Sequence, residues 1–215
     1  MKQLDKKTVI IASLAICIGY VIALYVYPSI PNVVVSHWNA MGEPDGFMPK
    51  ELLLFLTPSI ALFLFMFFAY IPRIDPFKKN FHAFKMSYNR LLIFLILFLI
   101  YVHIAIIVWN IGYSYNMLQA IMAALAWLFL GIGDVLRNIK QNWFVGIRTP
   151  WTLSSEYVWE RTHDVGGYLF EISGILIIFG ILVPSMSVFI VLGSVVGSLV
   201  ITLIYSYTLY KREQQ

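Results

Sequence analysis

The chain has 215 residues, of which 60% are hydrophobic and 12% charged, and this composition lies outside the range of soluble globular proteins. The formal net charge of +4 does not indicate nucleic-acid binding, because Lys and Arg occur in short clusters between apolar runs. The single cysteine, Cys17, lies inside an apolar run, which excludes an internal disulfide and a metal site built from several thiols.

Uncharged apolar runs predict six membrane-spanning helices. Runs 8–27 and 52–71 are each long enough to cross a hydrocarbon core of ~30 Å. The first run is expected to be retained, because Pro28 and Pro31 after it make no small-residue cleavage site. Run 91–133 has twice the required length and is expected to reverse at 110–116, a segment rich in Gly, Ser and Asn. Run 172–210 divides in the same way at 184–185.

The distribution of positive charge predicts an orientation. If the N-terminus is inside, every Lys and Arg except Lys50 falls on the cytoplasmic side, as the positive-inside rule requires. We therefore expect an all-α, multi-pass protein of the cell membrane with both termini cytoplasmic. The predicted parts are a helical hairpin (1–71) with a structured extracytoplasmic loop (28–50), and a four-helix domain (72–215) with a cytoplasmic loop (142–167). No internal repeat supports an inverted-repeat transporter.

The extracytoplasmic loop carries turn chemistry. Glu43-Pro-Asp-Gly46 is expected to close a chain reversal that presents His37 and Trp38 near the outer surface. Three interpretations stay open: a docking site for an extracellular ligand, a purely structural turn, and a metal site made by His37, Glu43 and Asp45. The metal interpretation is the weakest, because these ligands have no recognised spacing.

The cytoplasmic loop concentrates Trp and charged residues. Gly146 permits a tight turn, and Pro150 biases the preceding residue toward an extended conformation. Ser154 is a candidate helix N-cap, with Glu156 in the first turn. We expect a short helix over 155–163 that lies along the membrane surface, because Trp is typical of the boundary between lipid and water.

These two segments resemble known motifs. Asn-Trp-Phe-Val-Gly-Ile-Arg-Thr-Pro-Trp-Thr-Leu-Ser-Ser-Glu at 142–156, with Trp159, Thr162-His163 and Gly166-Gly167, resembles the signature loop of the SdpI family of bacterial membrane proteins. Pro31, the run His37 to Gly46 and Lys50 resemble the DUF1648 motif that often begins that family. The resemblance implies an immunity protein that protects its producer against a secreted, membrane-damaging peptide toxin. It also implies a receptor that holds a cytosolic transcriptional repressor at the membrane when toxin is present.

We expect toxin contact in the extracytoplasmic loop at His37, Trp38, Asn39, Gly42, Pro44 and Asp45. The residues expected to define the cytoplasmic loop are Asn142, Trp143, Gly146, Arg148, Thr149, Pro150, Trp151, Ser154, Glu156, Trp159, His163 and Gly167. Two interpretations stay open for these residues. They are structural and hold the loop against the helix ends, or Trp159, Glu160 and Arg161 form a surface that binds lipid or a repressor. Arg148 has three candidate partners: a lipid phosphate, a carboxylate of a partner protein, and Glu156.

Two ionisable residues lie within the predicted spans, where such residues tend to mark function. Glu171 is interpreted as a structural ion pair with Arg148 or Arg137, with a proton-relay role as the alternative. His103 is either functional or a neutral hydrogen-bonding side chain between helices. Gly193-Ser-Val-Val-Gly197 is expected to pack against another helix of the same chain, with a homodimer as the alternative.

No catalytic set emerges from the sequence, so we expect no enzyme activity and no cofactor or metal. The expected partners are membrane lipid, an extracellular peptide toxin and a cytosolic repressor, with no direct contact to nucleic acid. The alternative function is a small transporter or membrane-embedded enzyme that acts on a lipid or peptide through His103, Glu171 and Arg148.

Overall fold

The computed structural model describes residues 4–215 and contains six helices that are long and apolar enough to cross a membrane. Two short strands, one short α-helix and two 3-10 turns connect them. The elements in chain order are α1 (Lys6–Val26), β1 (Val33–Trp38), β2 (Pro44–Pro49), α2 (Lys50–Ile74), η1 (Lys78–His82), α3 (Lys85–Asn110), α4 (Met117–Leu136), α5 (Pro150–Ser154), α6 (Glu156–Leu182), η2 (Pro184–Met186) and α7 (Ser187–Glu213).

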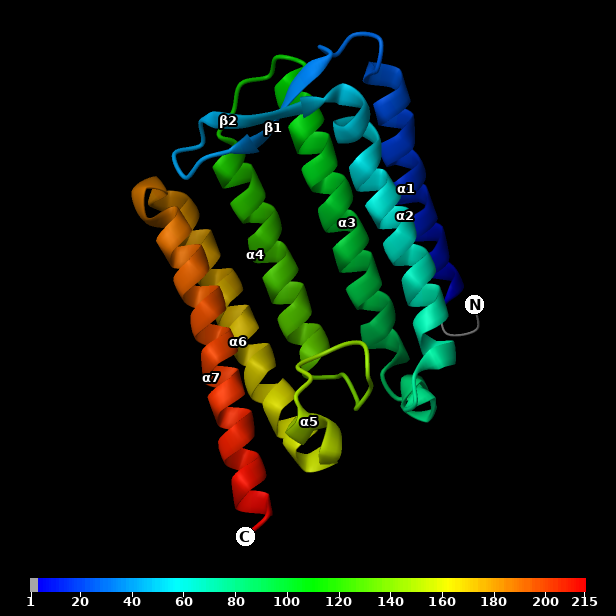
Figure 1. Ribbon diagram of the computed structural model, residues 1–215, viewed down its shortest axis with the longest axis vertical. Coiled ribbons are helices and arrows are strands. Elements are labelled where there is room, and N and C mark those ends of the chain that lie inside the picture. The colour runs from blue at the N-terminus through cyan, green and yellow to red at the C-terminus, as the bar shows by residue number, and fades with distance from the viewer. Residues whose placement is uncertain (1–3) are drawn as a thin grey trace.

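The six long helices form a flattened bundle rather than a ring (Figure 1). Helices α1, α2 and α3 pack against one another at one side, and α4, α6 and α7 follow at the other. The contact between α3 and α4 joins the two sets. The strands β1 and β2 lie at one end of the bundle, while α5, the start of α1 and the C-terminus lie at the opposite end.

The prediction of an all-α, multi-pass membrane protein is confirmed. Each long helix buries one face in the bundle and exposes large apolar side chains on the other, as a lipid environment requires. The predicted reversal at 110–116 separates α3 from α4, and the reversal at 184–185 falls in η2. The boundary between parts 1–71 and 72–215 stays a prediction, and Lys2, one of the charges used for orientation, lies outside the described residues.

The predicted surface helix over 155–163 is wrong in position. A short helix is present in this loop, but it is α5, and residues 156–163 are the first turns of α6. At ~1.5 Å per residue, the 27 residues of α6 span about 40 Å, which exceeds the ~30 Å hydrocarbon core. The charged first turns therefore extend beyond the apolar zone without a break in the helix.

The expectation for Gly193 and Gly197 is also wrong within the described chain. A Cβ added at either glycine would meet no atom within 4 Å, so neither glycine makes a close helix contact. Helix α7 packs on α6 through hydroxyl side chains instead, and the Ser173 and Ser198 oxygens lie 2.8 Å apart. Both hydroxyl oxygens also lie within hydrogen-bond distance of the Leu169 carbonyl oxygen, at 2.9 and 3.1 Å, so one hydroxyl can donate to this carbonyl while it accepts from the other. The homodimer stays a prediction.

Candidate functional site

Strands β1 and β2 form an antiparallel β hairpin (residues 33–49) that the sequence did not predict. Its reversal is made by Asn39, whose Oδ1 accepts hydrogen bonds from the backbone N–H groups of Met41 (2.9 Å) and Glu43 (3.0 Å). Gly42 supplies the left-handed backbone, with φ of +80°. The predicted turn at 43–46 is therefore wrong. Gly46 lies in β2 opposite His37, where an added Cβ would come within 2.7 Å of the His37 Cβ.

The β hairpin is fixed to the helix ends beneath it. Asn110, the last residue of α3, accepts a hydrogen bond from the Val35 N–H at 2.8 Å and donates one to the Val35 carbonyl oxygen at 2.9 Å. The Trp38 ring packs edge-on against Trp109, with centroids 5.3 Å apart. Trp38 thus serves as an anchor, and its side chain is only partly exposed.

Lys50 ties the other end of the β hairpin to α1. Its Nζ donates to the carbonyl oxygen of Tyr27, the C-cap of α1, at 3.0 Å, and lies 4.4 Å from the centre of the Tyr27 ring. A cation is favourable at this position because helix C-termini carry partial negative charge. The side chain of Lys50 is buried in this role.

The remaining hairpin surface is open. His37 Nδ1 lies 2.5 Å from Asp45 Oδ1, and both side chains are exposed. The Met41 and Phe47 side chains are 78% and 63% exposed, so large apolar groups flank this polar pair. Glu43 bonds to Asn39 instead of joining His37 and Asp45. No group of three potential ligands occurs within residues 4–215, and the metal interpretation has no support.

The signature loop (residues 142–167) is organised by Asn142, which is completely buried. Its Nδ2 donates to the carbonyl oxygens of Lys140 and Val145, both at 2.9 Å. Its Oδ1 accepts from the N–H groups of Phe144 (3.0 Å) and Val145 (2.7 Å). One amide side chain therefore replaces the secondary structure that this turn lacks.

Three polar residues outside the predicted motif hold the signature loop in place. Asp75 accepts hydrogen bonds from the N–H groups of Phe77 (2.7 Å) and Trp143 (2.9 Å). Asn80 donates to the Gln141 carbonyl oxygen at 2.8 Å, and Gln141 donates to two carbonyls of α5. The sequence did not indicate these residues, because each of them forms hydrogen bonds with backbone groups of a segment that is separate in the sequence.

Gly146, Trp159 and His163 form a buried contact inside the signature loop. The His163 ring stacks on Trp159 with centroids 4.0 Å apart; its Nδ1 donates to the Trp159 carbonyl oxygen, and its Nε2 accepts from the Ile147 N–H at 2.9 Å. This pair of bonds requires the neutral ring. Gly146 has φ of +117°, and a Cβ there would collide with His163. Because Trp159 is fully buried, it cannot belong to the predicted partner surface.

The caps of α5 and α6 correct another expectation. Thr149 and Thr152 form a reciprocal capping box around α5, which begins at Pro150. Ser155 caps α6 by accepting the Val158 N–H at 3.1 Å, whereas the predicted cap, Ser154, donates to the Trp151 carbonyl oxygen. The Trp151 indole donates to Ser206 of α7 at 2.8 Å, so this tryptophan connects the signature loop to the last helix.

The exposed side of the signature loop contains Trp143, Arg148, Glu156, Glu160 and Arg161. Arg148 donates to the Trp143 carbonyl oxygen at 2.5 Å, and it makes no ion pair with Glu156 in the described structure. Glu160 pairs with Lys140 of the preceding connection. The loop thus has a buried structural side and an exposed charged side.

Glu171 forms the ion pair that was predicted as one of two alternatives. Its Oε1 lies 2.5 Å from Arg137 Nη2 at the end of α4, and the Arg137 guanidinium lies over the Tyr168 ring at 4.7 Å. Arg137 also lies 4.0 Å from Asp134, which pairs with Arg90 of α3 at 3.1 Å. Charges on α3, α4 and α6 therefore form one network near the signature loop.

We expect Glu171→Gln to lower the free energy of unfolding by about 2 kcal/mol, because the partly buried Arg137 loses its nearest counter-charge. Thermal unfolding of the purified protein in detergent would measure the change. Glu156→Gln, at an exposed position in the first turn of the same helix, should cost less than about 1 kcal/mol, the effect of one charge on the helix dipole. The double variant Glu171→Gln/Arg137→Gln should recover part of the loss. Additive effects of the two substitutions would contradict the ion-pair interpretation.

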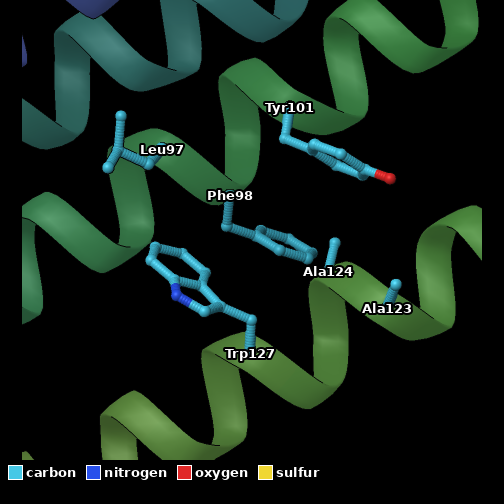
Figure 2. A pocket seen from close by; sticks show the side chains of 6 residues that line it. All are labelled: Leu97, Phe98, Tyr101, Ala123, Ala124 and Trp127. Carbon is cyan, nitrogen blue, oxygen red and sulfur yellow. The ribbon is translucent and has the colours of Figure 1, made fainter. Parts of the chain in front are cut away.

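A small apolar cavity of about 310 Å³ lies between α3 and α4 (Figure 2). It is lined by Leu97, Phe98, Tyr101, Ala123, Ala124 and Trp127, with the aromatic rings between the two helices and no charged side chain. His103 faces a different helix, with its Nε2 3.3 Å from the Gly19 carbonyl oxygen of α1. His103, Glu171 and Arg148 thus bond to three separate parts of the chain and do not converge on a polar pathway.

Comparison with known proteins confirms the family resemblance. Residues 138–206 match the SdpI/YfhL protein family, and residues 14–62 match the domain of unknown function DUF1648. The chain is 26% identical over 205 residues to a protein named "Immunity protein SdpI" from Bacillus subtilis (strain 168), covering 94% of this chain and 96% of that protein. No solved structure matches the chain significantly. The matched ranges contain the whole β hairpin and the whole signature loop.

Proposed function

We propose that this membrane protein, which carries the SdpI/YfhL and DUF1648 family segments, protects its cell against a secreted, membrane-active peptide. The similarity to a protein named for immunity extends over nearly the full length of both chains and supports this proposal. The main structural support for the proposal is the β hairpin. Asn110 and Trp38 fix it to the helix bundle, and its surface exposes His37, Asp45 and Phe47. A fixed surface with both apolar and charged groups suits an amphipathic peptide.

The charge distribution supports an outward-facing β hairpin. The one cation predicted on that side, Lys50, is buried against the end of α1, so its charge is used within the fold. The other basic residues within 4–215 lie at the signature-loop end, as expected for the cytoplasmic side. In this orientation an extracellular peptide reaches the β hairpin before it reaches the bilayer core.

The signature loop is the proposed docking surface for a cytosolic repressor. Trp143 and Arg161 are exposed and lie in the segment that matches the SdpI/YfhL family. A partner would bind these exposed side chains, because Asn142, Trp159 and His163 are occupied inside the loop. The proposed immunity and signalling surfaces therefore lie at opposite ends of the bundle and can be tested separately.

Protection can be measured as membrane potential in a toxin-sensitive bacterium that expresses the protein and is challenged with the family's peptide toxin. We expect His37→Ala/Phe47→Ser to lose most of the protection, because both side chains lie on the exposed hairpin surface. Tyr113→Ala removes an aromatic side chain that is 67% exposed in the α3–α4 connection and serves as the control. Trp143→Ala/Arg161→Ala should also keep full protection.

Expression in the membrane must be equal in all strains. If the wild-type protein is present and the potential still collapses, the proposed immunity to that toxin is wrong. If the hairpin variant protects as well as the wild type, immunity does not depend on the β hairpin, and the contact surface must be sought elsewhere.

A further inference from the structure

A second cavity has a different character from the one between α3 and α4. It is a groove of about 360 Å³ between α1 and α2, toward the signature-loop end of the bundle. Val9 of α1 and Phe65, Met66 and Ala69 of α2 make its walls apolar. Its lining also includes Tyr70 and Arg73, and Arg73 lies in the last turn of α2. Arg73 lies eight positions after Phe65, which is about 12 Å along the helix, so the apolar groove leads to a single cation.

Arg73 has no carboxylate partner within residues 4–215. The two nearby acidic residues are already engaged, since Asp5 accepts the Thr8 N–H at 2.7 Å and Asp75 accepts two backbone N–H groups. The hydrogen bond from Thr8 holds the pKa of Asp5 below its usual value. Further positive charge lies close by in the sequence, at Lys6, Lys7, Lys78 and Lys79.

Other basic residues in the same protein do find counter-charges. Arg90 pairs with Asp134, Arg137 with Glu171 and Lys140 with Glu160. Arg148 and Arg161 also make no ion pair among the described residues, but of these unpaired cations only Arg73 lines the apolar groove between α1 and α2. A cation at the end of an apolar groove suits an anionic group that is supplied from outside the chain.

We propose that the groove binds one anionic phospholipid. An acyl chain lies against Val9, Phe65 and Ala69, and the headgroup phosphate accepts hydrogen bonds from the Arg73 guanidinium. Tyr70 lies one turn of α2 before Arg73, and aromatic side chains favour the boundary between lipid chains and headgroups. The pattern matches the ligand, because an anionic phospholipid is apolar along its acyl chains and carries a net negative charge at its headgroup, which phosphatidylcholine does not. The site is independent of the proposed immunity function.

The test uses the full-length protein purified in detergent, with dioleoylphosphatidylglycerol and dioleoylphosphatidylcholine as probes of identical acyl composition. Native mass spectrometry measures the fraction of protein that retains one lipid. We expect the anionic lipid to be retained more strongly, and Arg73→Gln to weaken its binding roughly fivefold, the effect of about one cation near a lipid surface. Arg212→Gln, a cation in the last turn of α7 away from the groove, should leave binding unchanged.

A second variant tests the apolar part of the site. Ala69→Leu narrows the groove without a change in charge and should weaken retention of the anionic lipid even if Arg73→Gln fails to fold. Gel-filtration elution checks the fold of each variant. Equal retention of the two lipids by the wild-type protein would overturn the proposal, and so would unchanged binding in a folded Arg73→Gln or Ala69→Leu variant.

Discussion

Asn142→Asp is expected to lower the free energy of unfolding by about 3 kcal/mol, although the two side chains have nearly the same shape. The carboxylate can still accept the N–H groups of Phe144 and Val145. It cannot donate to the Lys140 and Val145 carbonyl oxygens, which would face a buried negative charge instead. Thermal unfolding in detergent would show a clear fall in the apparent melting temperature.

Asn138→Asp is the matched control for this experiment. Asn138 is exposed and donates one hydrogen bond, to the Asp134 carbonyl oxygen at 2.9 Å. Water can replace that bond, so the same substitution should cost less than 1 kcal/mol there. Equal losses at the two positions would mean that Asn142 has no special role in the signature loop.

Gly167→Val is expected to cost about 3 kcal/mol or more, because α4 and α6 approach closely at this point. A Cβ at Gly167 would lie 2.7 Å from the Gly133 carbonyl oxygen and would also collide with the Arg137 side chain. The backbone of α4 cannot move aside without loss of the Arg137–Glu171 pair. We expect a large fall in the yield of folded protein, measured by fluorescence-detected gel filtration.

The same substitution at Gly197 separates steric contact from helix propensity. A Cβ at Gly197 meets nothing within 4 Å, and Val is a slightly better helix former than Gly, so the yield should not fall. The elution position of Gly197→Val also reports whether this face holds a second copy of the chain. If both glycine variants fold equally well, the close contact between α4 and α6 is not essential.

The six spans could be predicted because hydropathy over a whole bilayer thickness is a long and redundant signal. The start of α6 could not be predicted, because the charges at Glu156, Glu160 and Asp164 made its first turns resemble a separate surface helix. Whether such a helix is continuous depends on the Ser155 cap and on burial of Trp159, and neither is visible in composition.

The β hairpin was missed for a related reason. The segment Val33–Trp38 does not alternate cleanly between apolar and polar residues, and its pairing depends on a reversal at Asn39 rather than at the Pro-Asp-Gly sequence that is typical of turns. For the candidate site, the sequence motif indicated the position of the signature loop, and the role of its residues stays a prediction. Its supports could not be found, because the bond between Asp75 and the Trp143 N–H joins residues 68 positions apart.

The two ends of the molecule differ in how much of the chain must be present before their stabilising contacts can form. Every anchor described for the β hairpin comes from residues up to Asn110, the last residue of α3. The signature loop draws on Asp75 near the end of α2 and also on Ser206 in the last helix. During synthesis from the N-terminus, the hairpin end has all its anchors once the third helix has left the ribosome, whereas the loop end must wait for α7. A chain interrupted late in translation would therefore have a complete hairpin end and an unfinished loop end.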